Sequence, residues 1–311
     1  MEVIDWLVVD ASNILHRAYY KEAARMRGAS GLAAHVAITS LNFIAGKFKP
    51  TKGIVCCFDR TSWRRAYTAS EQCISQLPYK GNRDKSRSAF TEQEKIDYAN
   101  FKRHVKSFED LLRHATSLHV LAADDLEGDD LIGGFVSRFP NDKIVIASTD
   151  GDYIQLCNDN VRIYCPVNKK VVDKLSTYDN DPDYFLFVKC IRGDTGDMVG
   201  SAYPGVRTTR IKKAYDDAFE REKLFCETWS NGLREFKVGD LFEENKLLMG
   251  LQHQPPPIRD FIQRTINEEL SRDKRFNLRL FSQYAREHDL RVIVNDIDKY
   301  ARLLAYKCTS E

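Results

Sequence analysis

The chain has 311 residues, of which 43% are hydrophobic, which is enough for one large core or two smaller ones. Its net charge is only +2, so the total charge identifies no partner. Eight cysteines without a Cys-x-x-Cys pair argue against a zinc site or a disulfide framework and favour a reducing cytoplasm. The acidic first residues do not resemble a signal peptide, and no apolar run approaches the length of about 18 residues that a membrane span needs. We therefore expect a cytoplasmic protein with no membrane partner.

The predicted elements alternate between strands and helices. Apolar runs predict strands at residues 6–9, 53–58, 118–121 and 144–147. Helical spacing of apolar residues predicts helices at residues 12–27, 31–48, 91–114, 126–139 and 184–191. The first of these helices is expected to be capped by Ser12-Asn13, and the third by a capping box of Thr91 and Glu94. This alternation is typical of a parallel α/β sheet.

Residues 60–90 differ from the rest, because they have no strong apolar period and are basic. They carry seven positively charged side chains against two negatively charged ones. A mobile basic segment beside a carboxylate site can neutralise a phosphate, and Tyr67 and Tyr79 could stack on the bases of a single strand. A solvated surface loop is the alternative interpretation of this run. Further along, a basic helix is predicted to begin near Thr208, and a proline-rich break at residues 254–257 precedes about 50 residues that are predicted to be helical.

Acidic residues follow three of the predicted strands. Asp10 and Asp59 end the first two strands, and the pair Asp150 and Asp152 follows the strand at residues 144–147. In a parallel sheet the carboxyl ends of the strands lie along one edge, where ligands bind. These side chains can therefore converge although they lie far apart in the sequence.

A further acidic cluster begins the helix at residues 126–139. Glu127 and Asp130 share one helix face, and Asp129 lies about 100° away from Asp130. So many carboxylates near a buried strand are costly unless cations cancel their repulsion. Oxygen-only ligands favour Mg²⁺ or Mn²⁺ over zinc. The number of carboxylates suits two ions, which would lie about 3.5–4 Å apart and stabilise the attacking and leaving oxygens of a phosphodiester.

Each of these acids also has a simpler interpretation. Aspartates after strands are common turn formers and helix caps, and for Asp124 and Asp125 capping is the better explanation. Asp194 and Asp197 lie in a Gly-Asp-Thr-Gly-Asp turn, which in isolation would be a helix C-cap followed by an Asx turn. Together with the other acids, this turn is predicted to form a second wall of the metal site.

Four motifs resemble those of the 5′-nuclease (flap endonuclease) superfamily, whose catalytic domain is PIN-like. They occupy residues 79–84, 126–131, 148–153 and 193–197. The resemblance covers roughly residues 3 to 215. Residues 63–65 and 148–170 are most similar to the T-even phage ribonuclease H enzymes of this superfamily.

The resemblance implies two Mg²⁺ ions, for which Mn²⁺ could substitute. It assigns one metal group to Asp10, Asp59, Glu127, Asp129 and Asp130. It assigns a second metal group to Asp150, Asp152, Asp194 and Asp197. Asp129 and Asp152 are also expected to take part in catalysis.

The resemblance further implies a helical arch at about residues 60–105, in which Lys80 and Arg83 contact the scissile phosphate as catalytic residues. A glycine-rich hairpin that grips duplex phosphates, often around a K⁺ ion, follows residue 197 in the family. Here Gly205 is present, but Arg207 replaces the second glycine, which leaves the K⁺ site open. The expected nucleic-acid-binding residues are Arg64, Arg65, Tyr79, Lys80, Arg83, Lys189, Arg207, Arg210, Lys212 and Lys213.

The expected fold is α/β, with a PIN-like, mostly parallel central sheet flanked by helices, a basic helical arch and a helical C-terminal duplex-binding region. The expected domains are the catalytic domain with its arch at residues 1–185, a helix-hairpin-helix-like DNA-binding region at 186–255, and a helical region at 256–311.

The expected function is Mg²⁺-dependent, structure-specific hydrolysis of phosphodiester bonds at 5′ ends or flaps of RNA/DNA or DNA duplexes. The expected task is primer removal during lagging-strand DNA replication, by a monomer that meets a single-strand DNA-binding protein and a sliding clamp. A PIN-type endoribonuclease and a non-catalytic branched-DNA-binding protein are the alternatives.

Overall fold

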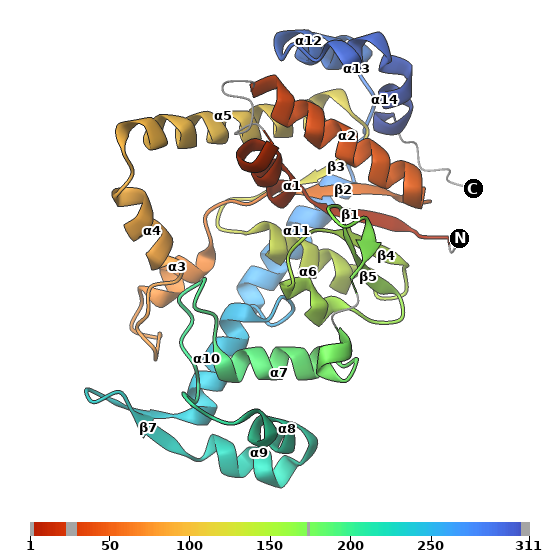
Figure 1. The fold of residues 1–311 in the computed structure, drawn as a ribbon. Coiled ribbons are helices and arrows are strands. Elements are labelled where there is room, and N and C mark those ends of the chain that lie inside the picture. Colours follow the sequence, from red (N-terminus) through yellow and green to blue (C-terminus); the bar gives the residue numbers. More distant parts are fainter. Residues whose placement is uncertain (1–2, 23–29, 173–174, 306–311) are drawn as a thin grey trace. The chain divides into compact units, whose positions relative to one another are not determined.

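The computed structural model describes residues 3–22, 30–172 and 175–305, and the chain forms two compact units (Figure 1). Unit 1 consists of Met1–Arg60, Thr91–Val172 and Asp260–Glu311, and unit 2 consists of Thr61–Phe90 and Asp173–Arg259. Both units are therefore built from segments that lie far apart in the sequence. Among the described helices, none is long and apolar enough to cross a membrane.

Unit 1 contains a six-stranded sheet in the order β3-β2-β1-β4-β5-β6. The strands are β1 (Trp6–Asp10), β2 (Gly53–Cys57), β3 (His119–Leu121), β4 (Ile144–Ala147), β5 (Val161–Cys165) and β6 (Lys170–Val171). The first five strands in chain order pair in parallel, and only β6 is antiparallel to its neighbour. Every residue of β1, β2 and β4 is buried, as expected for the centre of a parallel sheet. The prediction of a mostly parallel α/β sheet is confirmed.

The helices of unit 1 include segments from both ends of the chain. They are α1 (Ala11–Arg17), the π-helix η1 (Ala18–Glu22), α2 (Ser30–Phe48), α5 (Glu92–Ala115), α6 (Gly128–Arg138), the 3₁₀ helix η3 (Asp152–Leu156), most of α11 (Pro256–Leu270), α12 (Leu278–Glu287), α13 (Arg291–Asn295) and α14 (Ile297–Leu304). One apolar cluster joins the sheet to these helices through residues such as Leu7, Ile38, Phe108 and Phe281. The predicted capping box of Thr91 and Glu94 is present at the start of α5.

The first helix begins earlier than its predicted cap. The carboxylate of Asp10, and not Ser12 or Asn13, caps α1, because it accepts a hydrogen bond from the backbone N–H of Asn13 at 3.0 Å. The helical path then continues into η1, and the predicted end of the helix at residue 27 lies outside the described residues. Asp10 thus both ends β1 and begins α1.

Unit 2 is mainly helical. Its elements are α3 (Trp63–Thr68), α4 (Gly81–Ser88), the 3₁₀ helix η4 (Leu175–Tyr178), α7 (Pro182–Arg192), α8 (Thr208–Asp216), α9 (Ala218–Phe225), the hairpin strands β7 (Thr228–Ser230) and β8 (Glu235–Lys237), and α10 (Val238–Met249). The basic segment at residues 60–90 therefore holds two helices where no helical period was seen. Both are short and rich in charged residues, so neither has a long apolar stripe that a periodicity could reveal.

Buried carboxylates tie distant segments together inside each unit, and the predicted domain boundaries at residues 185 and 255 stay a prediction. In unit 2, Glu244 of α10 is 3% exposed and accepts hydrogen bonds from the backbone N–H groups of Ile74 and Ser75, the latter at 2.9 Å. In unit 1, Glu269 of α11 accepts a hydrogen bond from the N–H of Val120 at 2.8 Å. Such long-range pairings leave no local pattern in the sequence.

Candidate metal centre and basic segment

Asp10 is a buried carboxylate at the carboxyl end of β1, with 7% exposure. Its Oδ2 accepts hydrogen bonds from the Ser148 hydroxyl at 2.8 Å and from the Tyr153 hydroxyl at 3.1 Å. Burial, with the neighbouring carboxylates of Asp59 and Asp150, raises the pKa of Asp10 to about 7, against the opposing effect of the hydrogen bonds. The charged form of Asp10 is therefore disfavoured in this structure, and a bound cation would stabilise it.

Three acids at the start of α6 form a compact group. Carboxylate oxygens of Glu127, Asp129 and Asp130 all lie within 4.8 Å of one another. Glu127 and Asp130 are 8% and 0% exposed, and Asp130 caps the helix by accepting a hydrogen bond from the Glu127 N–H at 3.2 Å. Asp59 binds the same helix end, because its Oδ1 accepts from the N–H of Gly128 at 2.7 Å. The two strand-end aspartates and the α6 acids thus belong to one unit of the fold.

Asp150 and Asp152 follow β4 in a tight turn. The Asp150 N–H donates to Ser148 Oγ at 3.0 Å, and Asp150 Oδ1 accepts from the Asp152 N–H at 2.9 Å. Because β4 pairs in parallel with β1, the turn lies at the same edge of the sheet as Asp10. Asp150 is also close enough to Asp10 to contribute to its raised pKa.

These acids fit a hard divalent cation. All donors are carboxylate oxygens, and no histidine or cysteine belongs to the compact group found among the described residues. Oxygen donors of this kind are those that Mg²⁺ and Mn²⁺ prefer. The structure therefore brings together Asp10, Asp59, Glu127, Asp129, Asp130 and Asp150 with its neighbour Asp152 in unit 1.

Asp194 and Asp197 lie in unit 2, in the turn that follows α7. Lys189 approaches Asp194 Oδ2 at 3.2 Å. Burial raises the pKa of Asp194, but Lys189 and the backbone N–H groups of Gly196 and Asp197 together outweigh it, so the pKa lies below its ordinary value. The assignment of these two acids to the second metal group stays a prediction.

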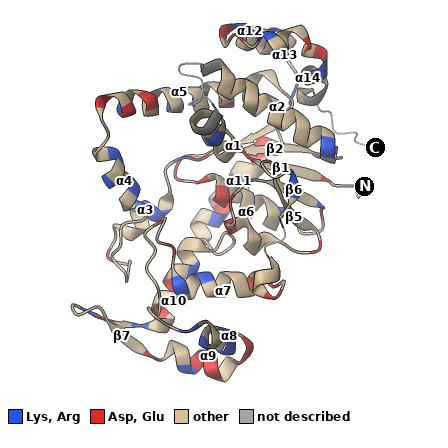
Figure 2. Cartoon of the chain, viewed as in Figure 1, with Lys and Arg blue, Asp and Glu red and all other residues tan. Residues whose placement is uncertain are grey.

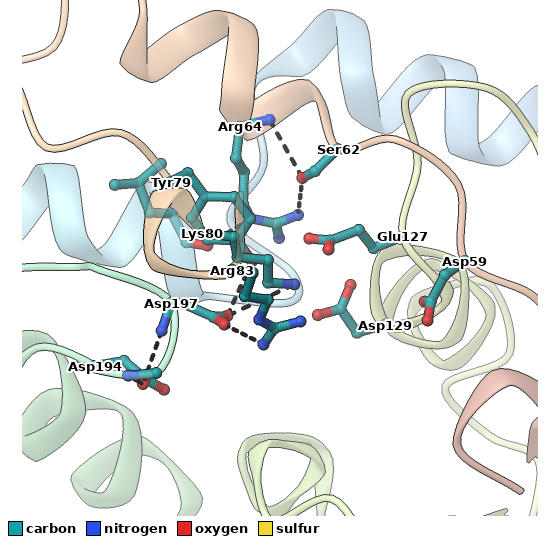
Figure 3. A network of polar contacts seen from close by, with 12 residues as sticks. Asp59, Ser62, Arg64, Tyr79, Lys80, Arg83, Glu127, Asp129, Asp194 and Asp197 are labelled. Carbon is teal, nitrogen blue, oxygen red and sulfur yellow. Dashed lines mark hydrogen bonds and ion pairs between the residues drawn. The ribbon is translucent and has the colours of Figure 1, made fainter. Parts of the chain in front are cut away.

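The basic segment at the start of α4 contacts Asp197, as Figure 3 shows. Arg83 Nη2 lies 2.6 Å from Asp197 Oδ1, and Lys80 Nζ lies 3.7 Å from Asp197 Oδ2. Basic residues continue along α3 and α4 (Figure 2). The predicted catalytic pair Lys80 and Arg83 therefore shares one carboxylate inside unit 2.

The position of Arg64 does not fit its predicted role in binding nucleic acid. Its side chain is 1% exposed, its Nε donates to the carbonyl of Leu248 at 2.6 Å, and its guanidinium lies 4.8 Å from the centre of a Trp63 ring. Tyr79 is also buried, with 4% exposure, and its hydroxyl donates to Asp197. Both side chains therefore serve to pack the segment in this structure, and neither offers an open surface to a phosphate or a base.

The other predicted nucleic-acid-binding residues lie in unit 2, and most of them pair with acids. Arg65 pairs with Asp84, Arg210 with Glu227, Lys212 with Asp216, and Lys213 with Glu220. Arg207 is the N-cap residue of α8, just after Gly205, which has a left-handed φ of 73°. Surface ion pairs of this kind contribute at most about 1 kcal/mol each, so they can exchange for phosphate contacts.

Sequence reasoning included Ser148 and Tyr153 in a motif but gave no role in the site to either of these polar residues. Both are buried, at 0% and 2% exposure, and both donate to Asp10. Burial, with the surrounding carboxylates, raises the pKa of Tyr153 well above its ordinary value. Both residues flank the Asp150–Asp152 pair in the sequence, and that proximity was the available signal.

A family model described as the 5′-3′ exonuclease N-terminal resolvase-like domain matches residues 5–181. Because this match covers more than half of the chain, the protein belongs to the 5′-3′ exonuclease family. Membership of the 5′-nuclease superfamily, predicted from the four motifs, is confirmed.

Among individual proteins, the chain is similar to the flap endonuclease of Escherichia phage T5, with 28% identity over 150 residues. That alignment covers 46% of this chain and 50% of the relative, so it spans about half the length of the relative. The fold resembles a crystal structure of a T5 protein co-crystallised with metal ions, with a TM-score of 0.62 and 16% identity over 92% of this chain and 98% of that chain. It also resembles a complex of the T5 flap endonuclease with DNA and metal ions, with a TM-score of 0.65 and 17% identity over 86% of this chain and 100% of that chain. At these identities the structural likeness supports the fold.

Proposed function

We propose that this protein is a Mg²⁺-dependent, structure-specific 5′-nuclease that hydrolyses phosphodiester bonds at 5′ ends or flaps. The observation that supports this best is the set of carboxylates at one edge of the sheet, with buried Asp10 beside Asp59 and the acids of α6. Membership of the 5′-3′ exonuclease family agrees with it. So does the flap endonuclease of phage T5, whose structure was determined with DNA and metal ions.

The metal ligands that we propose come from unit 1. Asp10, Asp59, Glu127, Asp129 and Asp130 would hold one ion, and Asp150 and Asp152 would take part in holding the second. When bound, such ions supply an activated water and stabilise the leaving oxygen. Asp129 and Asp152 are the acids that we expect to be most sensitive to substitution, because they are only partly buried.

The basic side chains of this protein would bind the phosphates of the substrate. Lys80 and Arg83 would neutralise the scissile phosphate and stabilise charge that develops on it. Arg207, Arg210, Lys212 and Lys213 at α8 would position a duplex through its backbone, without reading its sequence. Lys189, in the last turn of α7, would add a further positive charge near Asp194.

We propose primer removal during lagging-strand synthesis as the biological task. The substrate would be RNA/DNA or DNA duplex with a free 5′ end, in the cytoplasm of the cell where replication takes place. A single-strand DNA-binding protein and a sliding clamp are the partners that such a task implies.

The decisive experiment is cleavage of a 5′-flap duplex labelled at its 5′ end. Asp150→Asn should lower the rate in Mg²⁺ at least about 100-fold, because it removes a charged ligand. Asp159→Asn is the matched control, because Asp159 lies in the loop before β5, at the opposite edge of the sheet. It should leave the rate within about twofold of wild type.

Two outcomes would contradict the proposal. One is undiminished cleavage by the Asp150→Asn variant, and the other is cleavage by the wild-type protein in EDTA. A single-stranded RNA of the same length tests the PIN-type endoribonuclease. Faster cleavage of that RNA than of the flap would replace the 5′-nuclease by that alternative.

A further inference from the structure

The carboxylate of Asp197 contacts three side chains of one short basic segment, residues 79–83. Arg83 Nη2 lies 2.6 Å from Oδ1, the Tyr79 hydroxyl donates to Oδ2 at 3.1 Å, and Lys80 Nζ lies 3.7 Å from Oδ2. Figure 3 shows Lys80 and Arg83 directed at this carboxylate. The side chains of Asp197 and Lys80 are 21% and 13% exposed, so their contact is partly shielded from water, whereas Arg83 is 49% exposed. Two cations on one carboxylate form a small network of charge-assisted contacts.

Backbone contacts fix the same segment onto the same turn. The Lys80 N–H donates to the Asp197 carbonyl at 2.8 Å. The Asn82 side-chain amide donates to the carbonyls of Thr195 and Gly196, at 3.3 and 3.0 Å. Lys80 has a left-handed backbone, with φ of 56°, at the N-cap position of α4. A lysine in this conformation is unfavourable on its own, so these contacts help to stabilise the start of α4.

Tyr79 is held so that its hydroxyl points at Asp197. Its N–H donates to Thr68 Oγ1 at 3.1 Å, and the guanidinium of buried Arg64 lies 5.7 Å from the centre of its ring. Lys80 Nζ lies 4.9 Å from the same ring centre. Tyr79 therefore links the buried base of the segment to the Asp197 carboxylate.

We propose that Asp197 is a positioning residue that holds Lys80 and Arg83 as their counter-ion until a phosphate replaces it. This proposal rests on the proposed function, in which Lys80 and Arg83 contact a phosphate. A phosphate oxygen offers the two cations the same kind of acceptor as Asp197, so the substrate and the carboxylate compete for them. Asp197 thereby orders the start of α4 in advance and restrains its cations when no substrate is bound.

The first test measures order in the segment without metal or substrate. In EDTA, hydrogen exchange of the peptide that covers α4 should be about tenfold faster in Asp197→Asn than in wild type, because two ion pairs are lost. Asp194→Asn is the matched control. It removes one charge from the same turn, but its carboxylate pairs with Lys189 and accepts hydrogen bonds from the backbone N–H groups of Gly196 and Asp197. Its exchange in α4 should equal that of wild type.

An internal reporter shows whether the turn itself stays folded. The N–H of Val199 donates to the Asp194 carbonyl at 2.8 Å, so its exchange should not change in Asp197→Asn. If the exchange of the Val199 N–H does change, the Arg83→Gln variant tests the proposal instead. This substitution removes the shorter ion pair with Asp197 but changes no residue of the turn at residues 193–197. Faster exchange of α4 in Arg83→Gln then supports the proposal. Unchanged exchange of α4 in the deciding variant overturns it.

The second test measures the released charges, which a merely structural residue would not change. In EDTA, the affinity for single-stranded DNA should rise about tenfold in Asp197→Asn, because the DNA no longer has to displace the carboxylate from Lys80 and Arg83. Arg83→Gln on this background should return part of the increase. An unchanged affinity, with measurable binding, contradicts the competition for Lys80 and Arg83. Failure of every variant to bind DNA, with the exchange result intact, would instead contradict the proposed function.

Discussion

At the scale of single residues, burial controls the charge of two titratable groups in unit 1. Asp10 and His104 are 7% and 5% exposed, and burial favours the neutral form of each. The pKa of Asp10 therefore rises to about 7, while burial, with the nearby His288, lowers the pKa of His104 to about 4. The two groups have opposite effects on stability. As pH falls, Asp10 loses an unfavourable buried charge, whereas His104 is forced to gain one.

The His104 shift predicts a loss of stability in acid. Between the ordinary pKa of 6.5 and about 4, the unfolded chain binds more protons at His104 than the folded chain does. The stability present above pH 6.5 is therefore lost as pH falls, by about 2 kcal/mol at about pH 5. His104→Phe removes this contribution, so the variant should gain about 2 kcal/mol relative to wild type between about pH 7.5 and 5. Urea unfolding at the two pH values measures this, and parallel losses in both proteins would disprove it.

At the scale of elements, α6, which carries the candidate metal-binding acids, is packed very closely on α11. In α6, Gly134 lies against Ile262 of α11, and its carbonyl accepts a hydrogen bond from Gln263 at 3.0 Å. A Cβ atom built on Gly134 would lie 2.2 Å from the Ile262 side chain. The glycine is therefore required by the close approach of the two helices, despite the low helix propensity of glycine.

This packing predicts opposite effects for two Gly→Ala substitutions. Gly134→Ala should destabilise the protein by about 1–3 kcal/mol, because the added methyl group overpacks the contact with Ile262. Gly46→Ala should stabilise it by up to about 1 kcal/mol, since Gly46 is exposed in α2 and nothing lies within 4 Å of its added Cβ. Urea denaturation of both variants measures the difference. Equal effects would show that α6 and α11 are not in close contact.

At the scale of the whole molecule, the chain divides its candidate machinery between two units. The compact carboxylates belong to unit 1, and the basic helices α3, α4 and α8 belong to unit 2. Each unit combines segments from distant parts of the chain. A cation that binds these carboxylates should therefore stabilise mainly unit 1 against unfolding.

Metal addition should reveal this effect in the thermal unfolding of the protein. Mg²⁺ at about 100 times its Kd should stabilise the folded state by about 2.7 kcal/mol, which corresponds to a rise of several degrees in Tm. EDTA should reverse the rise, and Asp150→Asn should reduce it. Calorimetry with and without Mg²⁺ measures both changes. A rise of the same size in Asp150→Asn would show that the ion binds elsewhere.

The sequence alone predicted much of the fold because its signals were local. The buried strands and the capping box at Thr91 depend on neighbouring residues, and both are present in the structure. The acids Glu127, Asp129 and Asp130 were recognisable for the same reason, since helix spacing alone brings them together. The sequence motifs also determined the family of the protein.

The tertiary structure decided what depends on contacts between distant residues. It showed that Asp10 is buried under Ser148 and Tyr153, that Arg64 packs beneath Tyr79, and that Asp197 pairs with Arg83. It also assigned the last helices to the unit of the first strand. A local pattern cannot encode these features, because the charge of a carboxylate or a guanidinium depends on burial and on partners that only folding brings near.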